Sequence, residues 1–344
     1  PIDTLGFGSL YAFAQDPAMR ELGREGMDFA YYLLAVHSQQ GIFASSSGRT
    51  YIKEQFGNWS NCPSGLSWIG YGYGVPGHAG KGITSYCLSD YEPPKELAQW
   101  FSIPRGKEMI CQTTQGNDGY VDLYTYKTAD YMMTSANDFH PGEPGHQENP
   151  FQLTFNAVAQ LWVTHPGERV LFGAARPSYW AGNGTLPKVN QYKAFAGLIY
   201  DIAPEHPVDF THLYLPSMEF DRCEVEGKWA FVQLGSAYAA VYCSNGMRMQ
   251  NFGSNKDREC IAEGRRCIWL VRAAQADEFA VFEDFKAAMR GAALDADAEG
   301  RRYRFVDPVY GELRCQWGET LYVNDAPMQY SGFDNYGKLT MQEK

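Results

Sequence analysis

Two short stretches of the sequence combine groups that handle protons with groups that bind anions. The first is HSQQGIFASSSGRTY, in which a Ser- and Gly-rich loop separates His37 from Arg49 and Tyr51. A His or Tyr that moves protons and an Arg that offsets a carboxylate are what β-elimination from a uronic acid requires, because the C5 proton leaves only when the neighbouring charge is neutralised. Arg49 and Tyr51 share a face if the segment is extended, so they can meet. The alternative is a helix-capping His, a surface Arg and a packed Tyr.

The second stretch is GHQENPFQLTF, which runs into an apolar strand. If the segment is extended, His146 and Glu148 lie on one side and Gln147 lies on the other. A His and a carboxylate on one side can orient each other, bind a metal or act as an acid–base pair. The alternative is a polar turn exposed to solvent.

A third stretch, RPSYWAGNG, offers groups suited to a sugar ring. Arg176 could anchor an anion, while Tyr179, Trp180 and Asn183 could form a stacking and hydrogen-bonding platform. An Asn-Gly turn between two strands is the competing interpretation.

The composition narrows the class of partner. With 40 acidic and 29 basic side chains the formal net charge is -11, and phosphate backbones require a basic face, so we expect no nucleic-acid partner. No run approaches the ~20 apolar residues of a membrane helix, so we expect no membrane span. An anionic polysaccharide or oligosaccharide remains compatible, because a local Arg pocket can lie in an acidic protein. Aromatic residues make up 15% of the chain and can stack on sugars, although they are also good strand residues.

The cysteines and the first residue say little about function. Eight cysteines are spread along the chain without a CxxC motif, so the sequence encodes neither a zinc ribbon nor a thioredoxin motif. Cys260 and Cys267 could pair, but we favour buried free thiols. The sequence begins at Pro1, and we interpret it as a processed or cut chain whose N-terminal part is missing.

The sequence pattern of residues 1–115 predicts helices and long loops. A helix is expected from residue 16, with Asp16 as its N-cap and Pro17 in its first turn, and a shorter helix follows Pro93 and Pro94. The Gly-, Ser- and aromatic-rich stretch 45–82 predicts a long loop without a packed element, of the kind that often covers a site.

Residues 116–344 predict a large antiparallel β-sandwich. Residues 279–289 fit either a strand or a helix, and 294–302 predict a solvated loop. The sandwich is indicated by apolar strand runs that follow one another between Gly, Pro or Asn turns, at 120–137, 151–165, 194–203, 211–216, 228–244, 266–274 and 303–317.

Residues 145–167, GHQENPFQLTFNAVAQLWVTHPG, resemble the signature strand pair of the heparinase II/III-like polysaccharide lyases. That signature is a Gly-His-x-acid loop, an apolar strand, a short turn and a second strand that closes on Pro-Gly. His146 and Glu148 match the His and the acid, Phe151 and Leu153 match the strand core, and 166–167 match the closing turn. The stretches 228–244 and 265–284 are similar to later strands of that family. The resemblance covers about residues 118–290, and residues 1–60 only in outline.

The resemblance implies an α+β fold, with 1–115 as the end of an incomplete (α/α) toroid and 116–344 as the β-sandwich. It implies a polysaccharide lyase that cleaves a uronate-containing glycan by β-elimination, and a secreted or periplasmic protein rather than a cytoplasmic one. The family takes its catalytic Tyr and its neutralising Asn or His from the helical domain, and Tyr51 and His37 are candidates by chemistry rather than by a matched motif. The full set of candidates is His37, Tyr51, His146 and Glu148 for catalysis, and Arg49, Gln147, Arg176, Tyr179, Trp180 and Asn183 for substrate binding.

The sequence departs from the family at its metal site. His165 stands where the family has an Asp before Pro-Gly, and residues 190–192 offer no His where the family has a His-Asn pair. We therefore predict no cofactor, with a divalent metal near His146 and His165 as the alternative.

Two further functions stay open. One is a glycoside hydrolase, for which Glu148 and Asp138 are the nearest carboxylate pair. The other is a non-catalytic sugar-binding or structural sandwich. A lyase of the toroid-plus-sandwich type binds its substrate between the two units, so we expect His37, Arg49 and Tyr51 to face the same cleft as His146 and Glu148.

Overall fold

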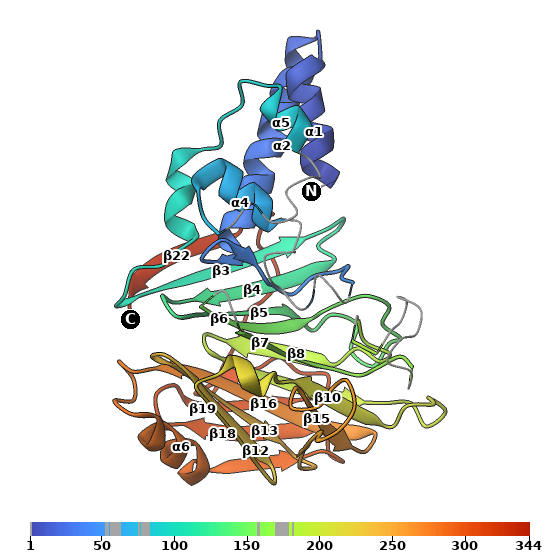
Figure 1. The fold of residues 1–344 in the computed structure, drawn as a ribbon. Coiled ribbons are helices and arrows are strands. Elements are labelled where there is room, and N and C mark those ends of the chain that lie inside the picture. Colours follow the sequence, from blue (N-terminus) through green and yellow to red (C-terminus); the bar gives the residue numbers. More distant parts are fainter. Residues whose placement is uncertain are drawn as a thin grey trace.

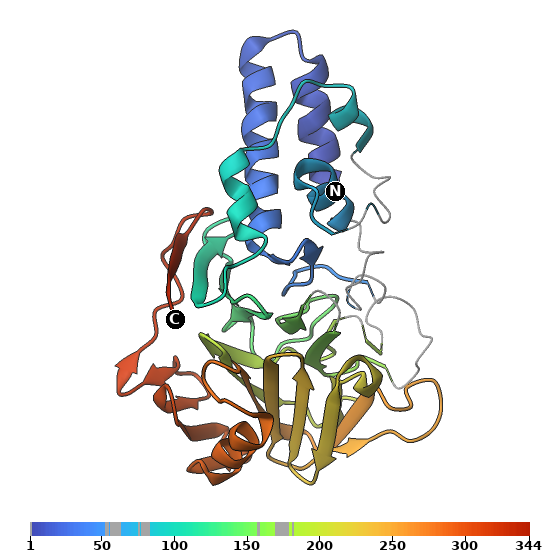
Figure 2. The ribbon, with the colours of Figure 1, turned by 60° about the vertical axis from the view of Figure 1, so that its left-hand side comes forward.

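The computed structural model describes residues 2–51, 55, 63–74, 76, 83–156, 159–168, 179, 180 and 182–344. Helices lie on one side of a large antiparallel sheet, and two smaller sheets lie on its other side (Figures 1 and 2). The N-terminal helices are α1 (Ile2–Phe13), α2 (Pro17–Val36), α4 (Ser64–Tyr71) and α5 (Ile83–Cys87), followed by the 3₁₀ helix η1 (Lys95–Trp100).

Helix α2 begins where the sequence predicts. The Asp16 side chain accepts a hydrogen bond from the backbone N–H of Ala18, and Pro17 occupies the first turn. Met27, Tyr31 and Leu34 lie at helical spacing and are buried, so one face of α2 packs inward. The helix ends at Val36, and its C-terminal end is directed at the large sheet (Figure 2).

The described strands form a short pair, β1 (Ser38–Gln39) with β2 (Ile42–Phe43), and three antiparallel sheets. The nine-stranded sheet has the order β14 (Arg248–Met249), β15 (Glu259–Glu263), β10 (Phe210–Tyr214), β7 (Ala159–Thr164), β6 (Phe151–Phe155), β5 (Tyr131–Asn137), β4 (Val121–Lys127), β3 (Lys107–Gln115) and β22 (Lys338–Glu343). The six-stranded sheet has the order β11 (Arg222–Glu226), β12 (Trp229–Leu234), β13 (Ala237–Cys243), β16 (Arg266–Gln275), β9 (Phe195–Asp201) and β8 (Lys188–Tyr192).

A five-stranded sheet and two short helices complete the fold. The helices are α6 (Phe282–Gly291) and the 3₁₀ helix η2 (Ser217–Glu219). The sheet has the order β17 (Leu294–Asp297), β18 (Arg302–Asp307), β19 (Gly311–Gln316), β20 (Tyr322–Val323) and β21 (Ala326–Pro327).

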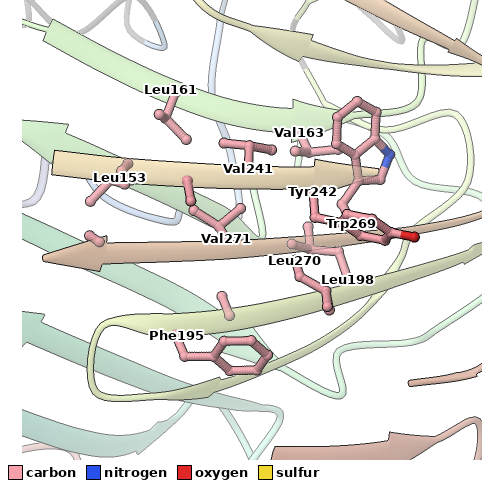
Figure 3. Close-up of a cluster of buried hydrophobic side chains, with 14 of the residues drawn as sticks. Leu153, Leu161, Val163, Phe195, Leu198, Val241, Tyr242, Trp269, Leu270 and Val271 are labelled. Atoms are coloured by element: carbon pink, nitrogen blue, oxygen red, sulfur yellow. The ribbon is translucent and has the colours of Figure 1, made fainter. Parts of the chain in front are cut away.

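The nine-stranded sheet has two chemically different faces, because successive side chains of a strand point to opposite sides. Leu153 and Leu161 belong to the apolar core with Val241 and Val271 of the six-stranded sheet (Figure 3). Each buried apolar side chain of this size contributes about 1.5–3 kcal/mol relative to its exposed state. The opposite face carries polar side chains that are equally buried, namely Thr125, Lys127, Thr134, Gln152, Thr154 and Gln160.

The sheets confirm the prediction of a mixed fold dominated by antiparallel strands, but several details differ from the sequence analysis. Strand β3 ends at residue 115, so it lies before the expected boundary between the two units but already belongs to the large sheet. Strand β22 pairs with it from the far end of the chain. Residues 294–302, expected to form a loop, contain β17, and α4 lies within the stretch expected to hold no element. Residues 279–289 fall mainly in a helix rather than a strand.

None of the described helices combines the length and the apolarity needed to cross a bilayer.

Candidate functional site

The first two candidate stretches lie side by side in the structure. Ser47 and Asn149 exchange backbone hydrogen bonds of 2.9 and 2.8 Å as an isolated antiparallel bridge. Thr50 and Gln147 are joined twice, through Thr50 N–H to the Gln147 carbonyl at 3.0 Å and through Gln147 Nε2 to the Thr50 carbonyl at 3.1 Å. The loop after α2 and the loop before β6 therefore form one unit, although about a hundred residues separate them.

This unit lies on the polar face of the nine-stranded sheet. The Ser46 N–H donates to Thr134 Oγ1 at 2.7 Å, and the Thr154 hydroxyl donates to the Ala44 carbonyl at 3.0 Å. Buried backbone groups of a loop need partners of this kind, which explains why the covered face is polar.

A cavity of about 280 Å³ opens where the loop unit, α2 and the sheet meet. His37 and Glu148 both line it, so one candidate from each stretch faces the same space. The remaining lining consists of apolar and small polar residues: Leu33, Phe43, Ser45, Ser46, Ser47, Gly48, Gln115, Tyr120, Val121, Leu123, Ala136, Phe139 and Pro150. A largely apolar hollow with a few convergent polar groups is typical of a ligand site.

His37 is the C-cap of α2 and is only 6% exposed. Its Nδ1 lies 2.9 Å from the Thr125 hydroxyl, while its buried Nε2 has no hydrogen-bond partner among the described residues. Burial, together with the nearby Lys127 charge, lowers the pKa of His37 to about 3. The imidazole is therefore neutral at ordinary pH, and it can hydrogen-bond a ligand without adding charge.

Lys127 lies beneath the same helix end. Its ammonium donates to the Ala35 carbonyl at 3.0 Å and to the Trp100 carbonyl at 2.8 Å, at the C-terminal ends of α2 and η1. Cations are favourable at helix C-termini because they satisfy orphan carbonyls and oppose the helix dipole. Complete burial nevertheless lowers the pKa of Lys127 to about 7. This residue joins the helical part to the sheet next to His37.

Arg49 and Tyr51 meet as their spacing suggests. Arg49 Nη2 donates to the Tyr51 hydroxyl at 2.9 Å, and the guanidinium carbon lies 5.8 Å from the ring centroid. Arg49 is exposed and Tyr51 is half-buried. Neither residue is part of the cavity lining, which along this loop ends at Ser47 and Gly48.

The second stretch departs from its expected geometry, because β6 begins only at Phe151 and residues 146–148 are not a strand. The Glu148 carboxylate turns back onto the chain and accepts hydrogen bonds from the backbone N–H groups of His146 and Gln147. His146 is exposed, while Gln147 is buried and bound to Thr50. The carboxylate thus shapes the loop rather than pairing with the imidazole.

The third stretch does not present the expected platform. Tyr179 and Trp180 are 8% and 1% exposed, and Trp180 stacks on His212 with ring centroids 4.1 Å apart. The Tyr179 hydroxyl donates to Glu259 at 2.5 Å. These faces are occupied by other side chains, because both residues complete an aromatic cluster with Trp162, Val208, Phe210 and Tyr214. Arg176 lies outside the described residues.

The Asn183 side chain binds the protein backbone and is not available to a sugar. It is buried, its Nδ2 donates to the Glu148 carbonyl at 3.1 Å, and its Oδ1 accepts from the His165 N–H at 3.0 Å. The neighbouring Gly182 has φ +87° and lies so close that an added Cβ would be 2.6 Å from the Gln147 Cα. This segment therefore holds the 146–148 loop in place.

The alternative metal centre finds little support in the side chains that the structure describes. His165 is fully buried, its ring packs 4.5 Å from that of His206, and its Nε2 lies 3.3 Å from the Val208 carbonyl. His146, by contrast, is exposed. Among the described residues no group of three or more His, Cys, Asp or Glu side chains is arranged to hold a metal.

The sequence analysis missed two aromatic residues at the cavity, Tyr120 and Phe139. Tyr120 is 61% exposed, and its ring centroid lies 5.2 Å from that of Phe139. Tyr120 follows the turn between β3 and β4, and Phe139 follows β5, so both lie at the same end of adjacent strands. The turn sequence GNDGY gives a signal for the first of them, since a large aromatic residue at a tight turn has little core to enter.

Comparison with known proteins adds nothing to this geometry. No protein-family model, curated protein or solved structure matches the chain.

Proposed function

We propose that the protein is a carbohydrate-active lyase that cleaves a uronate-containing glycan by β-elimination, with its site where the helical part meets the sheet. The observation that carries the proposal is the pairing of residues 47–50 with 147–149. It brings Glu148 to the cavity that His37 also lines, and the hydrogen-bonded Arg49 and Tyr51 belong to the same loop unit.

The Arg49–Tyr51 pair supplies the base in this proposal. An unperturbed Tyr has a pKa near ~10 and needs an adjacent cation before its phenolate is accessible at neutral pH. The guanidinium donates directly to the Tyr51 hydroxyl and so places a cation at that oxygen. Tyr51 then removes the C5 proton of the uronate and returns it to the leaving glycosidic oxygen, while Arg49 offsets the carboxylate charge.

His37 and Glu148 have supporting roles. The neutral His37 lines the cavity, and its buried Nε2, which has no partner among the described residues, is the group that we assign to a sugar hydroxyl or carboxylate. Glu148 fixes the loop through two backbone N–H groups. The exposed ring of Tyr120 and the half-buried ring of Phe139 line the same cavity and provide a stacking surface for the sugar ring.

The glycoside-hydrolase alternative is less well supported. Its second carboxylate, Asp138, is occupied by the Lys188 ammonium and by Asn190 Nδ2, the latter at 3.0 Å. Glu148 is bound to backbone N–H groups. Both carboxylates are therefore engaged by donors of the protein itself, whereas a hydrolase needs one carboxylic acid that reaches the leaving group.

The antiparallel helices α1 and α2 are also what the last part of an (α/α) toroid would contribute, and we include that assignment in the proposal. In this arrangement the end of α2 and the strands of the large sheet each provide one wall of the substrate cleft.

The test uses a panel of uronate-containing polymers and the same polymers with their carboxyl groups reduced. We expect the ultraviolet absorbance of a conjugated double bond to grow only with the uronate forms, because elimination needs the carboxylate to acidify C5. Arg49→Ala should lower this rate by about 10²-fold or more, as expected for loss of charge stabilisation. Arg314→Ala is the matched control, since Arg314 lies 4.1 Å over the ring of Tyr322 on the remote five-stranded sheet. New reducing ends without that absorbance would refute the proposal.

A further inference from the structure

Two cysteines of the six-stranded sheet face each other. The Cys243 and Cys267 Sγ atoms are 3.3 Å apart, and both side chains are fully buried. Cys243 is the register partner of Trp269, so Cys267 lies two residues further along the neighbouring strand and on the same face. The sequence instead left a Cys260–Cys267 pair open, but Cys260 lies against Met249 Sδ at 3.9 Å.

We propose that Cys243 and Cys267 are a disulfide site, which joins β13 to β16 when the chain folds in an oxidising environment. A disulfide needs its sulfurs at about 2 Å, so the two sulfurs must approach by roughly 1 Å more. The other described cysteines lie elsewhere, at Cys87, Cys111, Cys223, Cys260 and Cys315.

The two thiols have different surroundings in the folded protein. Burial raises the pKa of the Cys267 thiol, but hydrogen bonds from Cys243 and from the Thr211 and Ser244 hydroxyls outweigh it and leave the pKa below its usual value. The Cys243 thiol has a raised pKa through burial and through its contact with Cys267. Both sulfurs are shielded in this state, so the proposal rests on their proximity and not on these shifts.

The reaction balances with oxidised glutathione as the oxidant. One of the two thiolates attacks one glutathione sulfur and releases one reduced glutathione. The other thiolate then attacks the protein sulfur of the mixed disulfide and releases the second. Two electrons and two protons pass from the protein thiols to the two glutathione molecules. The sulfurs are shielded in the folded protein, so the bond forms before β13 and β16 close completely.

The experiment is refolding of the full chain from denaturant with oxidised and reduced glutathione, in parallel with refolding under dithiothreitol. Free thiols are then blocked in denaturant, and peptides are analysed by mass spectrometry without reduction. We expect a peptide pair linked through Cys243 and Cys267, lighter than the two thiol peptides by two hydrogen atoms. The oxidised protein should also melt several degrees higher than the reduced protein, because the link constrains the unfolded chain.

The matched variants are Cys243→Ala and Cys260→Ala, which remove buried cysteines of the same exposure. The first should abolish the linked peptide, and the second should leave it intact. Complete blocking of both Cys243 and Cys267 after oxidative refolding of the unchanged chain would overturn the proposal, as would a link from Cys267 to any other cysteine. Neither outcome depends on glycan cleavage.

Discussion

The two faces of the nine-stranded sheet have different tasks in this molecule. The face toward the six-stranded sheet is an apolar core that continues through Leu153, Leu198 and Val271 into the second layer (Figure 3). The face toward the helices carries Thr125, Lys127 and other polar side chains that bind a loop and a helix end. The first face supplies stability through burial, while the second positions groups that can do chemistry. The same strands thus support both the fold and the candidate site.

The largest expected effect is on the polar face. Tyr51→Phe removes the hydroxyl that receives the Arg49 hydrogen bond. Loss of a positioned acid or base lowers turnover by about 10²- to 10⁴-fold, so kcat should fall by that factor while the melting temperature stays nearly unchanged. Tyr322→Phe, which alters another Tyr paired with an Arg, should keep full turnover. Near-normal kcat in Tyr51→Phe would remove Tyr51 from the site.

Substitutions on the apolar face should instead lower the free energy of unfolding. Phe155 belongs to the sandwich core and Phe101 belongs to the smaller cluster around α2, and both are fully buried. Phe155→Ala should cost about 3–5 kcal/mol of unfolding free energy. Phe101→Ala should cost less, because the smaller cluster can relax around the cavity more easily. Urea titration of both variants gives the two values, and a larger cost at Phe101 would contradict the assignment of stability to the sandwich.

A smaller effect on both stability and substrate binding is expected at Gly182, which contacts the 146–148 loop. Gly182→Ala places a Cβ against Gln147 at 2.6 Å and also requires an alanine at φ +87°. Gly318 has φ +85° with open space around it, so Gly318→Ala carries the backbone cost alone, about 1–2 kcal/mol. We expect Gly182→Ala to lose more unfolding free energy than the control, and also to raise KM because the 146–148 loop shifts. Equal losses with unchanged KM would show that the loop does not depend on this contact.

The last predicted effect, which is absent at neutral pH, is the pH dependence at His37. The pKa of His37 is about 3 in the folded protein and about 6.5 when unfolded, so between these values the unfolded state binds the additional proton. Its contribution to stability is therefore present above pH 6.5 and is lost as the pH falls toward 3. The difference between the melting temperatures of the wild type and His37→Asn should therefore shrink as the pH falls through this window. The exposed His146→Asn serves as the control, and it should follow the wild-type profile.

The sequence predicted those elements whose signals are local. Asp16 and Pro17 mark the start of α2, and the alternating apolar runs mark the strands, because capping and periodicity depend on neighbouring residues. The Arg49–Tyr51 contact follows from their spacing in the same way. These features needed no knowledge of distant contacts.

Burial and long-range pairing could not be read in this way. Tyr179 and Trp180 have the composition of a sugar platform, but contacts with His212 and Glu259 from later strands bury them. The pairing of Ser47 with Asn149 joins distant segments, and so does the addition of β22 beside β3. Glu148 was expected beside His146 on one side of an extended segment, but the bend of the chain turns its carboxylate onto the backbone.

The most direct test of the central claim is digestion of a uronate polymer in water labelled with heavy oxygen, followed by immediate borohydride reduction and mass spectrometry of the products. Elimination breaks the bond between the glycosidic oxygen and C4, so the new reducing end keeps its original oxygen and no water is consumed. We predict unlabelled reducing ends and partner fragments that carry a double bond. Heavy oxygen at the new reducing end, with saturated partner fragments, would show hydrolysis and contradict the account.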